Sequence, residues 1–221
     1  MTEGSLNISP IISTLGELGV ASINLAADEL EHFLKALRRI GRITRSELIV
    51  RTQAEARSNS LSGRFGVGGF PHHTDFAFRP IPPRLLILHN ESSHVFQRGT
   101  FVSTVDLLPP KLLRTLDRSS WYLTNGGRTF NVSARISIGD RSAIRWDPLC
   151  LSAANAAAHE CCELIPHQLS QSQVRHRWSP GSALIIDNWR STHAREALEE
   201  GGDHDRRIIR YEVWQHARMD I

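Results

Sequence analysis

Cysteine is scarce in this sequence, and no apolar run is long enough to cross a membrane. The chain holds three cysteines, Cys150, Cys161 and Cys162. An odd number without a secretion signal builds no disulfide framework and is typical of a reducing compartment. Neighbouring Cys161 and Cys162 fall in an alanine-rich helical stretch, where we expect reduced packing residues. A membrane span needs about 20 consecutive apolar residues, and no run approaches that length.

A signal peptide and an excess of charge of one sign are missing as well. Residues 1–10 are polar and lack the basic and apolar segments of a secretion signal, so we expect a soluble, cytoplasmic protein. The 26 Lys and Arg against 23 Asp and Glu leave a net charge of +3, spread evenly along the chain. Because nucleic-acid-binding domains concentrate basic residues on one face, we expect neither a nucleic-acid nor a membrane partner.

The length and composition suit one packed domain rather than two. The chain has 221 residues, of which 40% are hydrophobic, and it carries no repeat, low-complexity tract or domain-breaking linker. We expect a single domain over residues 1–221, with N-terminal support from about 1–60 and a core from about 61–216. Nothing in the sequence indicates an oligomeric state.

Apolar spacing predicts one helix and one strand in the first quarter of the chain. Residues 23–40 place apolar side chains at helical intervals. Asn24 or Asp28 is available to cap the start of this helix, and Gly41 to end it. A short strand is expected at 46–52.

Beyond the Gly- and Ser-rich loop at 57–71, short strand-like runs alternate with turns. Helices are expected at about 107–117 and 152–169. Many short, irregularly spaced strands favour an antiparallel barrel or jelly roll with the early helices packed outside it. The predicted strands are 73–78, 84–89, 100–105, 121–124, 129–138, 142–147, 174–178, 182–187 and 206–214.

The segment PHHTDFAF at 71–78 carries the first candidate metal ligands. Side chains two residues apart in a strand point to the same face, so His73 and Asp75 are expected to project together. An imidazole beside a carboxylate supplies two ligands of the two-histidine, one-carboxylate facial triad of Fe(II) enzymes. His72 points to the opposite face, away from Asp75. Because His-x-Asp also occurs by chance, the interpretation needs a third ligand.

The segment GSALIIDNWRSTHARE at 181–196 supplies that third ligand. An apolar strand runs into a polar turn and then reaches His193. A histidine just past a core strand can be directed back into the mouth of a barrel. The turn residues Asp187, Asn188 and Arg190 are placed to hydrogen-bond the segment, and a metal-binding histidine usually needs such support.

The arginine-rich segment RRIIRYEVW at 206–214 is the third feature. In a strand, Arg206 and Arg210 share one face, while Arg207 lies on the other. An arginine on an inward face is unfavourable unless an anion meets it. A dicarboxylate cosubstrate would provide that anion through strong guanidinium–carboxylate pairs.

In this combination the sequence resembles the taurine dioxygenase (TauD/TfdA) and clavaminate synthase-like family of Fe(II)/2-oxoglutarate-dependent oxygenases. The matching segments, FPHHTDFAF, IIDNWRSTHAR and RRIIR, follow the family order over roughly residues 60–216. The resemblance implies a mainly β fold with flanking helices around a double-stranded β-helix, a jelly-roll or cupin-like core. It also implies Fe(II), 2-oxoglutarate as cosubstrate and O2, with the iron held by His73, Asp75 and His193.

The resemblance assigns the cosubstrate contacts with two alternatives left open. Arg206 would pair with the distal carboxylate of 2-oxoglutarate, although the neighbouring Arg207 could take this role. Arg210, one strand repeat further, would face the cosubstrate or the substrate. The family also uses a threonine against the same carboxylate, and Thr100 matches better than Thr104 because the following helix then falls in place.

The expected reaction is oxidation of a C–H bond in a small amino-acid-like or natural-product molecule, with release of succinate and CO2. Asp75 stands where related halogenases carry Ala or Gly, so hydroxylation, desaturation or cyclisation is favoured over halogenation. The chain is shorter than typical family members, and the inserts that often form a substrate lid are reduced. The alternatives are a metalloenzyme that does not use 2-oxoglutarate, such as a zinc hydrolase or an oxidase, and a non-catalytic jelly-roll binding protein. The residues considered for substrate selection are Phe76, Phe78, Arg79, Trp121, Trp189 and Arg195.

Overall fold

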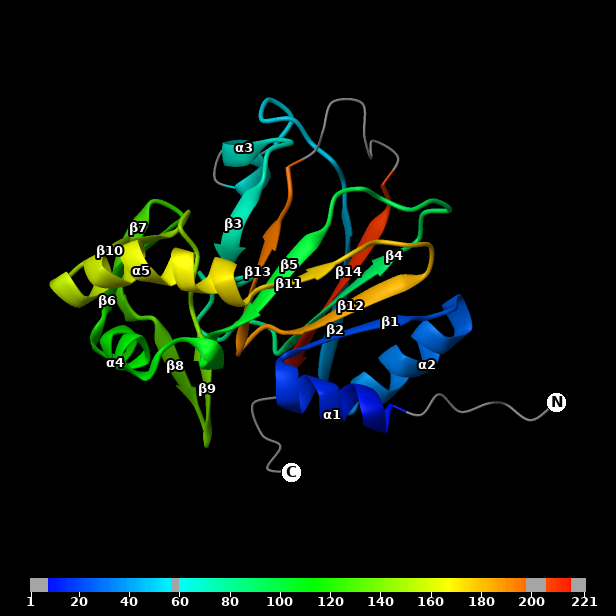
Figure 1. Cartoon of the computed structure of the whole chain (residues 1–221), viewed down its shortest axis with the longest axis horizontal. Helices are drawn as coiled ribbons and strands as arrows, with labels where there is room; N and C mark the ends of the chain where they lie inside the picture. The colour runs from blue at the N-terminus through cyan, green and yellow to red at the C-terminus, as the bar shows by residue number, and fades with distance from the viewer. Residues whose placement is uncertain (1–7, 57–59, 198–205, 216–221) are drawn as a thin grey trace.

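Two antiparallel sheets facing each other form the centre of the structure, a computed structural model that describes residues 8–56, 60–197 and 206–215 (Figure 1). The larger sheet has the order β1-β12-β4-β14-β2 and the smaller sheet the order β11-β5-β13-β3. This arrangement confirms the predicted mainly β fold with a jelly-roll core. The strands of the larger sheet are β1 (Val20–Asn24), β2 (Gly41–Leu48), β4 (Leu85–Asn90), β12 (Ser182–Asp187) and β14 (Ile208–Gln215), and those of the smaller sheet are β3 (Phe70–His73), β5 (Thr100–Thr104), β11 (Val174–His176) and β13 (Ser191–Arg195).

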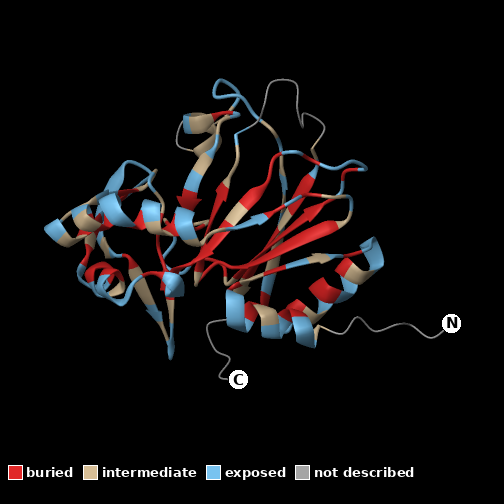
Figure 2. Ribbon diagram, in the orientation of Figure 1, coloured by how far each residue is buried: buried red, intermediate tan, exposed pale blue. Residues whose placement is uncertain are grey.

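Apolar side chains fill the space between the two sheets. Every residue of β4 and of β12 is buried, as expected for central strands with both faces covered (Figure 2). The cluster between the sheets comprises Leu86, Leu88, Phe96, Val102, Trp178, Leu184, Ile186 and Ile208. This filled interior leaves the metal-binding candidates at one end of the sandwich.

Two N-terminal helices, α1 (Ser9–Leu18) and α2 (Ala27–Leu37), cover the outer face of the larger sheet (Figure 1). Their apolar faces pack on the outward residues of β4, β12 and β14. Helix α1 ends at Gly19, whose positive φ of 72° lets its amide donate back to the carbonyl of Leu15. A Cβ at Gly19 would lie 2.6 Å from Ser191 Oγ, so only glycine allows β13 to approach this corner.

A second group of elements packs at the other side of the smaller sheet, around its own apolar cluster. Trp121 and Trp146 meet edge to face within this cluster, with their ring centroids 5.5 Å apart. Helix α5 begins at Asn155, whose side chain accepts a hydrogen bond from the amide of Ala158. The elements are the 3-10 helix η1 (Val105–Leu107), α4 (Pro110–Arg118), α5 (Ala156–Ser172), β6 (Ser120–Asn125), β7 (Arg128–Ser133), β8 (Arg135–Ile138), β9 (Arg141–Ile144) and β10 (Leu151–Ala153).

The N-terminal boundaries differ from those predicted. Helix α1 was not expected, and the predicted helix 23–40 begins only at Ala27 because Ile23 and Asn24 pair with β12. Its start is capped neither by Asn24 nor by Asp28: the side chain of Glu29 accepts the amide of Ala26. The predicted strand 46–52 is β2, which already begins at Gly41 because it pairs along its length with β14.

Later boundaries also shift. The predicted strand 129–138 is two strands, and helix 107–117 splits into η1 and α4 because Pro109 and Pro110 start a new helix. Part of the loop expected at 57–71 forms the short helix α3 (Leu61–Phe65), while residues 57–59 lie outside the described part. Cys161 is buried as expected, but Cys162 is exposed and free. None of the helices in the described ranges is long and apolar enough to cross a membrane.

Candidate metal centre

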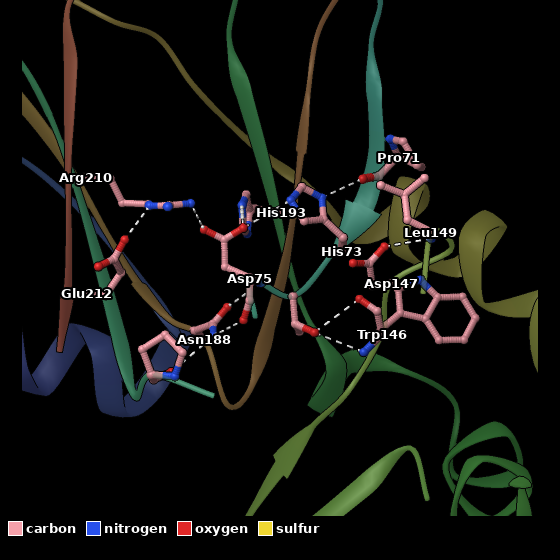
Figure 3. A network of polar contacts seen from close by, with 12 residues as sticks. Pro71, His73, Asp75, Trp146, Asp147, Leu149, Asn188, His193, Arg210 and Glu212 are labelled. Atoms are coloured by element: carbon pink, nitrogen blue, oxygen red, sulfur yellow. Dashed lines mark hydrogen bonds and ion pairs between the residues drawn. The ribbon is translucent and has the colours of Figure 1, made fainter. Parts of the chain in front are cut away.

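The three predicted metal ligands meet in space. One donor atom from each of His73, Asp75 and His193 lies within 4.8 Å of the other two. Asp75 Oδ1 lies 3.5 Å from His73 Nε2 and 3.7 Å from His193 Nε2, so the same carboxylate oxygen faces both imidazoles (Figure 3). Two imidazoles and one carboxylate form a donor set that suits Fe(II) and leaves open positions on the ion.

Strand pairing and a turn bring these residues together. His73 and His193 stand opposite each other on β3 and β13, and their ring centroids are 4.3 Å apart. Asp75 does not lie in a strand, so the predicted strand 73–78 is wrong beyond its first residue. Strand β3 ends at His73 because Thr74 turns aside: its amide and hydroxyl both donate to the carbonyl of Trp146. The turn, rather than strand alternation, presents Asp75 to His73.

His72 points away from this centre, as predicted. Its Nδ1 lies 3.1 Å from Thr192 Oγ1 and its Nε2 lies 2.9 Å from Gln173 Oε1. Both ring nitrogens are therefore engaged on the opposite side of β3. Burial lowers the pKa of His72, which favours the neutral ring in this position.

Hydrogen bonding orients His73 for metal binding. Its Nδ1 lies 2.9 Å from the carbonyl oxygen of Pro71, which can only accept, so Nδ1 carries a proton and, in the neutral ring, Nε2 carries the lone pair. The same arrangement is missing at His193, where Nδ1 is buried and has no hydrogen-bond partner among the described residues. Both histidines direct Nε2 towards Asp75, but only His73 is held in this orientation by a hydrogen bond at Nδ1.

The charge distribution favours an ionised carboxylate. Burial opposes ionisation of Asp75, but Arg210 and the two histidines outweigh it and hold its pKa well below the usual range. Burial, reinforced by His73, lowers the pKa of His193 to about 3, so this imidazole is neutral at pH 7. His193 and Asp75 thus have the protonation states that metal binding requires, whereas Asp75 outweighs burial and raises the pKa of His73, so a metal ion would compete with a proton on that ring.

The polar turn before β13 supports the site, as predicted for its three polar residues. Asn188 binds the backbone of Asp75 through both atoms of its side-chain amide. Asp187 accepts a hydrogen bond from Arg84 at 2.7 Å, and Arg190 donates to Asp106 at 2.7 Å. The turn is thereby tied to three separate segments of the chain.

A cavity of about 420 Å³ opens beside the three candidate ligands. Its lining includes Thr100 and Arg206, together with Arg210. The alternatives lie elsewhere: the hydroxyl of Thr104 donates to the carbonyl of Leu18 at 2.5 Å, and exposed Arg207 pairs with Glu47 and Glu91. The geometry thus places Thr100 and Arg206, rather than their rivals, beside the metal centre.

The cavity wall is strongly cationic at the end occupied by Arg206. Burial and the neighbouring guanidinium groups of Arg98 and Arg206 lower the pKa of Arg195 to about 9. Arg195 also donates to the carbonyls of Gly66 and Gly68 at 2.7 and 2.6 Å, and its guanidinium carbon lies 3.3 Å above the Phe70 ring. Four arginines and two carboxylates line the described part of the cavity, and this excess of basic side chains favours an anionic ligand.

Of the six residues considered for substrate selection, only Arg195 lines this cavity. Trp121 and Trp189 are buried in the structure, and Trp189 donates its indole N–H to the carbonyl of Pro82. Phe76 contacts Trp214, and Arg79 lies over the ring of Phe78. Sequence reasoning also missed Glu212, a buried carboxylate two residues after Arg210 on the same strand face; its spacing was the available signal.

Residues 137–211 match the family described as "Taurine catabolism dioxygenase TauD, TfdA family". The matched segment contains His193, Arg206 and Arg210. No curated protein sequence matches the chain.

Solved structures share the fold at low sequence identity. An asparagine oxygenase in complex with Fe(II), 2S,3S-3-hydroxyasparagine and succinate superimposes with a TM-score of 0.71 and 14% identity, covering 93% of this chain and 78% of that chain. The PvcB protein from Pseudomonas aeruginosa gives a TM-score of 0.66 and 18% identity, covering 96% and 81%. The non-haem iron oxygenase OrfP, in complex with Fe, succinate and (3S)-hydroxy-L-Arg, gives 0.65 and 14%, covering 92% and 77%. Residues 137–211 therefore match the TauD, TfdA family, in agreement with the resemblance read from the sequence, and the chain shares the fold of these solved structures.

Proposed function

We propose that this chain is an Fe(II)- and 2-oxoglutarate-dependent dioxygenase that oxidises a C–H bond of a small molecule. The observation that carries the proposal is the convergence of His73, Asp75 and His193 on one point at the edge of a cavity. Bound iron and 2-oxoglutarate would supply the oxidising chemistry with O2, releasing succinate and CO2. The protein would supply the ligand geometry and the orientation of both substrates.

The metal would be held by His73 Nε2, Asp75 Oδ1 and His193 Nε2. The donor chemistry fits the ion, since the donors are two imidazole nitrogens and a carboxylate oxygen. Asp75 is present, so no ligand position is given up to a halide. Hydroxylation, desaturation or cyclisation therefore fits the site better than halogenation.

Arg206 and Thr100 would hold the distal carboxylate of 2-oxoglutarate. Trp178 donates its indole N–H to Thr100 Oγ1 at 3.2 Å, which leaves the hydroxyl proton of Thr100 for an incoming acceptor. Arg195 and Arg206 both line the cavity, so a carboxylate bound there would meet guanidinium groups. A dicarboxylate offers one acidic group to these residues and a second to the metal.

The substrate we propose is a small amino-acid-like or natural-product molecule. Asparagine oxygenase and OrfP, which share the fold, are described in complexes with a hydroxylated asparagine and a hydroxylated arginine. The whole chain would serve this site as a single, cytoplasmic domain, without a nucleic-acid or membrane partner.

Substrate-stimulated succinate release tests the proposal. Purified protein with Fe(II), 2-oxoglutarate and O2 is assayed against free amino acids and related small molecules, with Asp75→Ala as the control that lacks one proposed ligand. The proposal predicts that at least one compound stimulates succinate release in the wild type and none does in the variant. Equal succinate formation by Asp75→Ala would contradict the assignment of the metal centre.

A further inference from the structure

A buried carboxylate, Glu212, lies behind the metal centre without lining its cavity. Only 4% of the residue is exposed. It shares one face of β14 with Arg210, and both residues stand opposite hydroxyl-bearing residues of β2: Glu212 pairs with Thr44, and Arg210 with Ser46. The register thus places two hydroxyl groups beside a carboxylate and a guanidinium group.

Every oxygen of this carboxylate is engaged. Glu212 Oε1 accepts hydrogen bonds from Ser46 Oγ at 3.1 Å and from Arg210 Nε at 2.8 Å. Glu212 Oε2 accepts a hydrogen bond from Thr44 Oγ1, which in turn accepts the indole N–H of Trp214 at 3.0 Å. A buried charge held by this many donors is fixed in position, since any movement would break several bonds at once.

The other end of the guanidinium group holds Asp75. Arg210 Nη1 lies 2.7 Å from Asp75 Oδ2, while Oδ1 of the same carboxylate faces the two histidines (Figure 3). The ring of Phe76 supports the guanidinium group from one side, with its centroid 5.2 Å from the central carbon. The two oxygens of Asp75 therefore have different partners.

We propose that Glu212 is a positioning residue for the metal centre: it holds Arg210 so that the guanidinium group occupies only Asp75 Oδ2 and leaves Oδ1 for the metal ion. This inference rests on the proposed metal-dependent function. Within the described part of the chain, Glu212 neither lines the cavity nor belongs to the candidate ligands, so it acts through Arg210.

Two physical effects work in the same direction. An arginine that is free to turn pairs with both oxygens of a carboxylate, and this two-point pairing would compete with the ion for Asp75. The bond from Arg210 Nε to Glu212 prevents the rotation. Glu212 also neutralises the positive charge of Arg210, which would otherwise repel a divalent cation bound at Asp75.

Glu212→Gln tests the inference, because it keeps the size of the side chain and removes its charge. Glu91→Gln is the matched control: Glu91 also pairs with an arginine, Arg207, but outside the cavity. Binding of Fe(II) and of Co(II) is measured anaerobically by calorimetry, and the visible spectrum of the Co(II) form reports the coordination of Asp75. We expect Glu212→Gln to bind either ion about 10- to 100-fold more weakly with an altered Co(II) spectrum, and Glu91→Gln to match the wild type.

Ser46→Ala provides a second variant that keeps all charges and loses one hydrogen bond each to Glu212 and Arg210. Ser46→Ala should weaken binding of the ion about two- to tenfold. If Glu212→Gln fails to fold, wild-type ion affinity in Ser46→Ala would contradict the role of Glu212. If a folded Glu212→Gln variant binds the ions with wild-type affinity and shows an unchanged Co(II) spectrum, the role of Glu212 is contradicted, but the proposed function is not. A wild-type protein that binds neither ion would instead overturn the proposed function, and this inference with it.

Discussion

Asn188 holds the backbone of Asp75 from both sides: its Oδ1 accepts the amide of Asp75, and its Nδ2 donates to the carbonyl of Asp75, each at 3.1 Å. Nδ2 also donates to the carbonyl of Pro83 at 3.1 Å, and Asn188 is fully buried. The turn that precedes β13 therefore fixes the carboxylate ligand, just as β13 itself carries His193. The segment formed by this turn and β13 therefore positions two of the three candidate ligands, Asp75 and His193.

Replacing Asn188 by Ala should destabilise the protein by about 2–4 kcal/mol, because it leaves the partly buried amide and carbonyl of Asp75 without this partner. Urea unfolding of the metal-free protein measures this loss. Asn125→Ala, at an exposed position of β6, is the control and should stay within about 0.5 kcal/mol of the wild type. An Asn188→Ala variant as stable as this control would show that the contact with Asp75 contributes little.

The two neighbouring histidines should respond differently to the same substitution. His73→Gln removes a proposed ligand and should reduce Fe(II) affinity by more than the 10- to 100-fold effect typical of residues outside the ligand set. His72→Gln should lower stability, because it breaks contacts to Thr192 and Gln173, and leave Fe(II) affinity unchanged. Anaerobic Fe(II) titration of both variants distinguishes the two sites. Loss of iron binding in His72→Gln rather than in His73→Gln would reverse the assignment.

The two neighbouring arginines offer a similar pair. Arg206→Ala should raise the 2-oxoglutarate concentration needed for half-maximal succinate release about 10- to 100-fold, since a charge-assisted hydrogen bond contributes about 1.5–3 kcal/mol. Arg207→Ala, which only breaks exposed pairs with Glu47 and Glu91, should behave as the wild type. A raised 2-oxoglutarate requirement in Arg207→Ala, with Arg206→Ala unchanged, would mean that Arg207 binds the cosubstrate carboxylate.

His176 should make stability depend on pH in a defined window. This histidine is 6% exposed, its Nδ1 lies 2.9 Å from Ser22 Oγ, and burial lowers its pKa to about 4, against 6.5 for an ordinary histidine. Below pH 6.5 the unfolded chain therefore binds a proton that the folded protein does not. The unfolding free energy falls as the pH drops from about 6.5 to 4, by about 2 kcal/mol at pH 5.

His176→Asn keeps a hydrogen-bonding group near the position of Nδ1 and removes the titration. Urea unfolding at pH 7.5 and pH 5 should show a smaller loss of stability in this variant than in the wild type. An identical loss in both proteins would assign the pH dependence to other groups.

Local sequence pattern was sufficient for the core strands and for part of the site. The apolar runs of β4 and β12 and the spacing of Arg206 and Arg210 depend only on strand periodicity, and the structure places both arginines at the cavity. Arg206 lies two residues before β14 begins, yet the alternation still holds there. The same rule separated His72 from His73.

Features decided by distant partners were not predictable from this pattern. Strand β3 stops at His73 because Thr74 bonds to Trp146, which is 72 residues away in the sequence. Ile23 and Asn24 fit a helical pattern but pair with β12, a segment from the far end of the chain. From the sequence alone, Glu212 looks like a surface residue. Its burial depends on the hydroxyl groups of Thr44 and Ser46 on β2, which a local pattern does not reveal.

The most direct test of the account is the absorption spectrum of the purified protein under anaerobic conditions, with Fe(II), before and after addition of 2-oxoglutarate. We expect a metal-to-ligand charge-transfer band in the visible region on addition of 2-oxoglutarate, and no band in Asp75→Ala. Iron bound without any such band would contradict the use of 2-oxoglutarate and indicate another kind of metalloenzyme. No bound iron at all would contradict the metal centre formed by His73, Asp75 and His193.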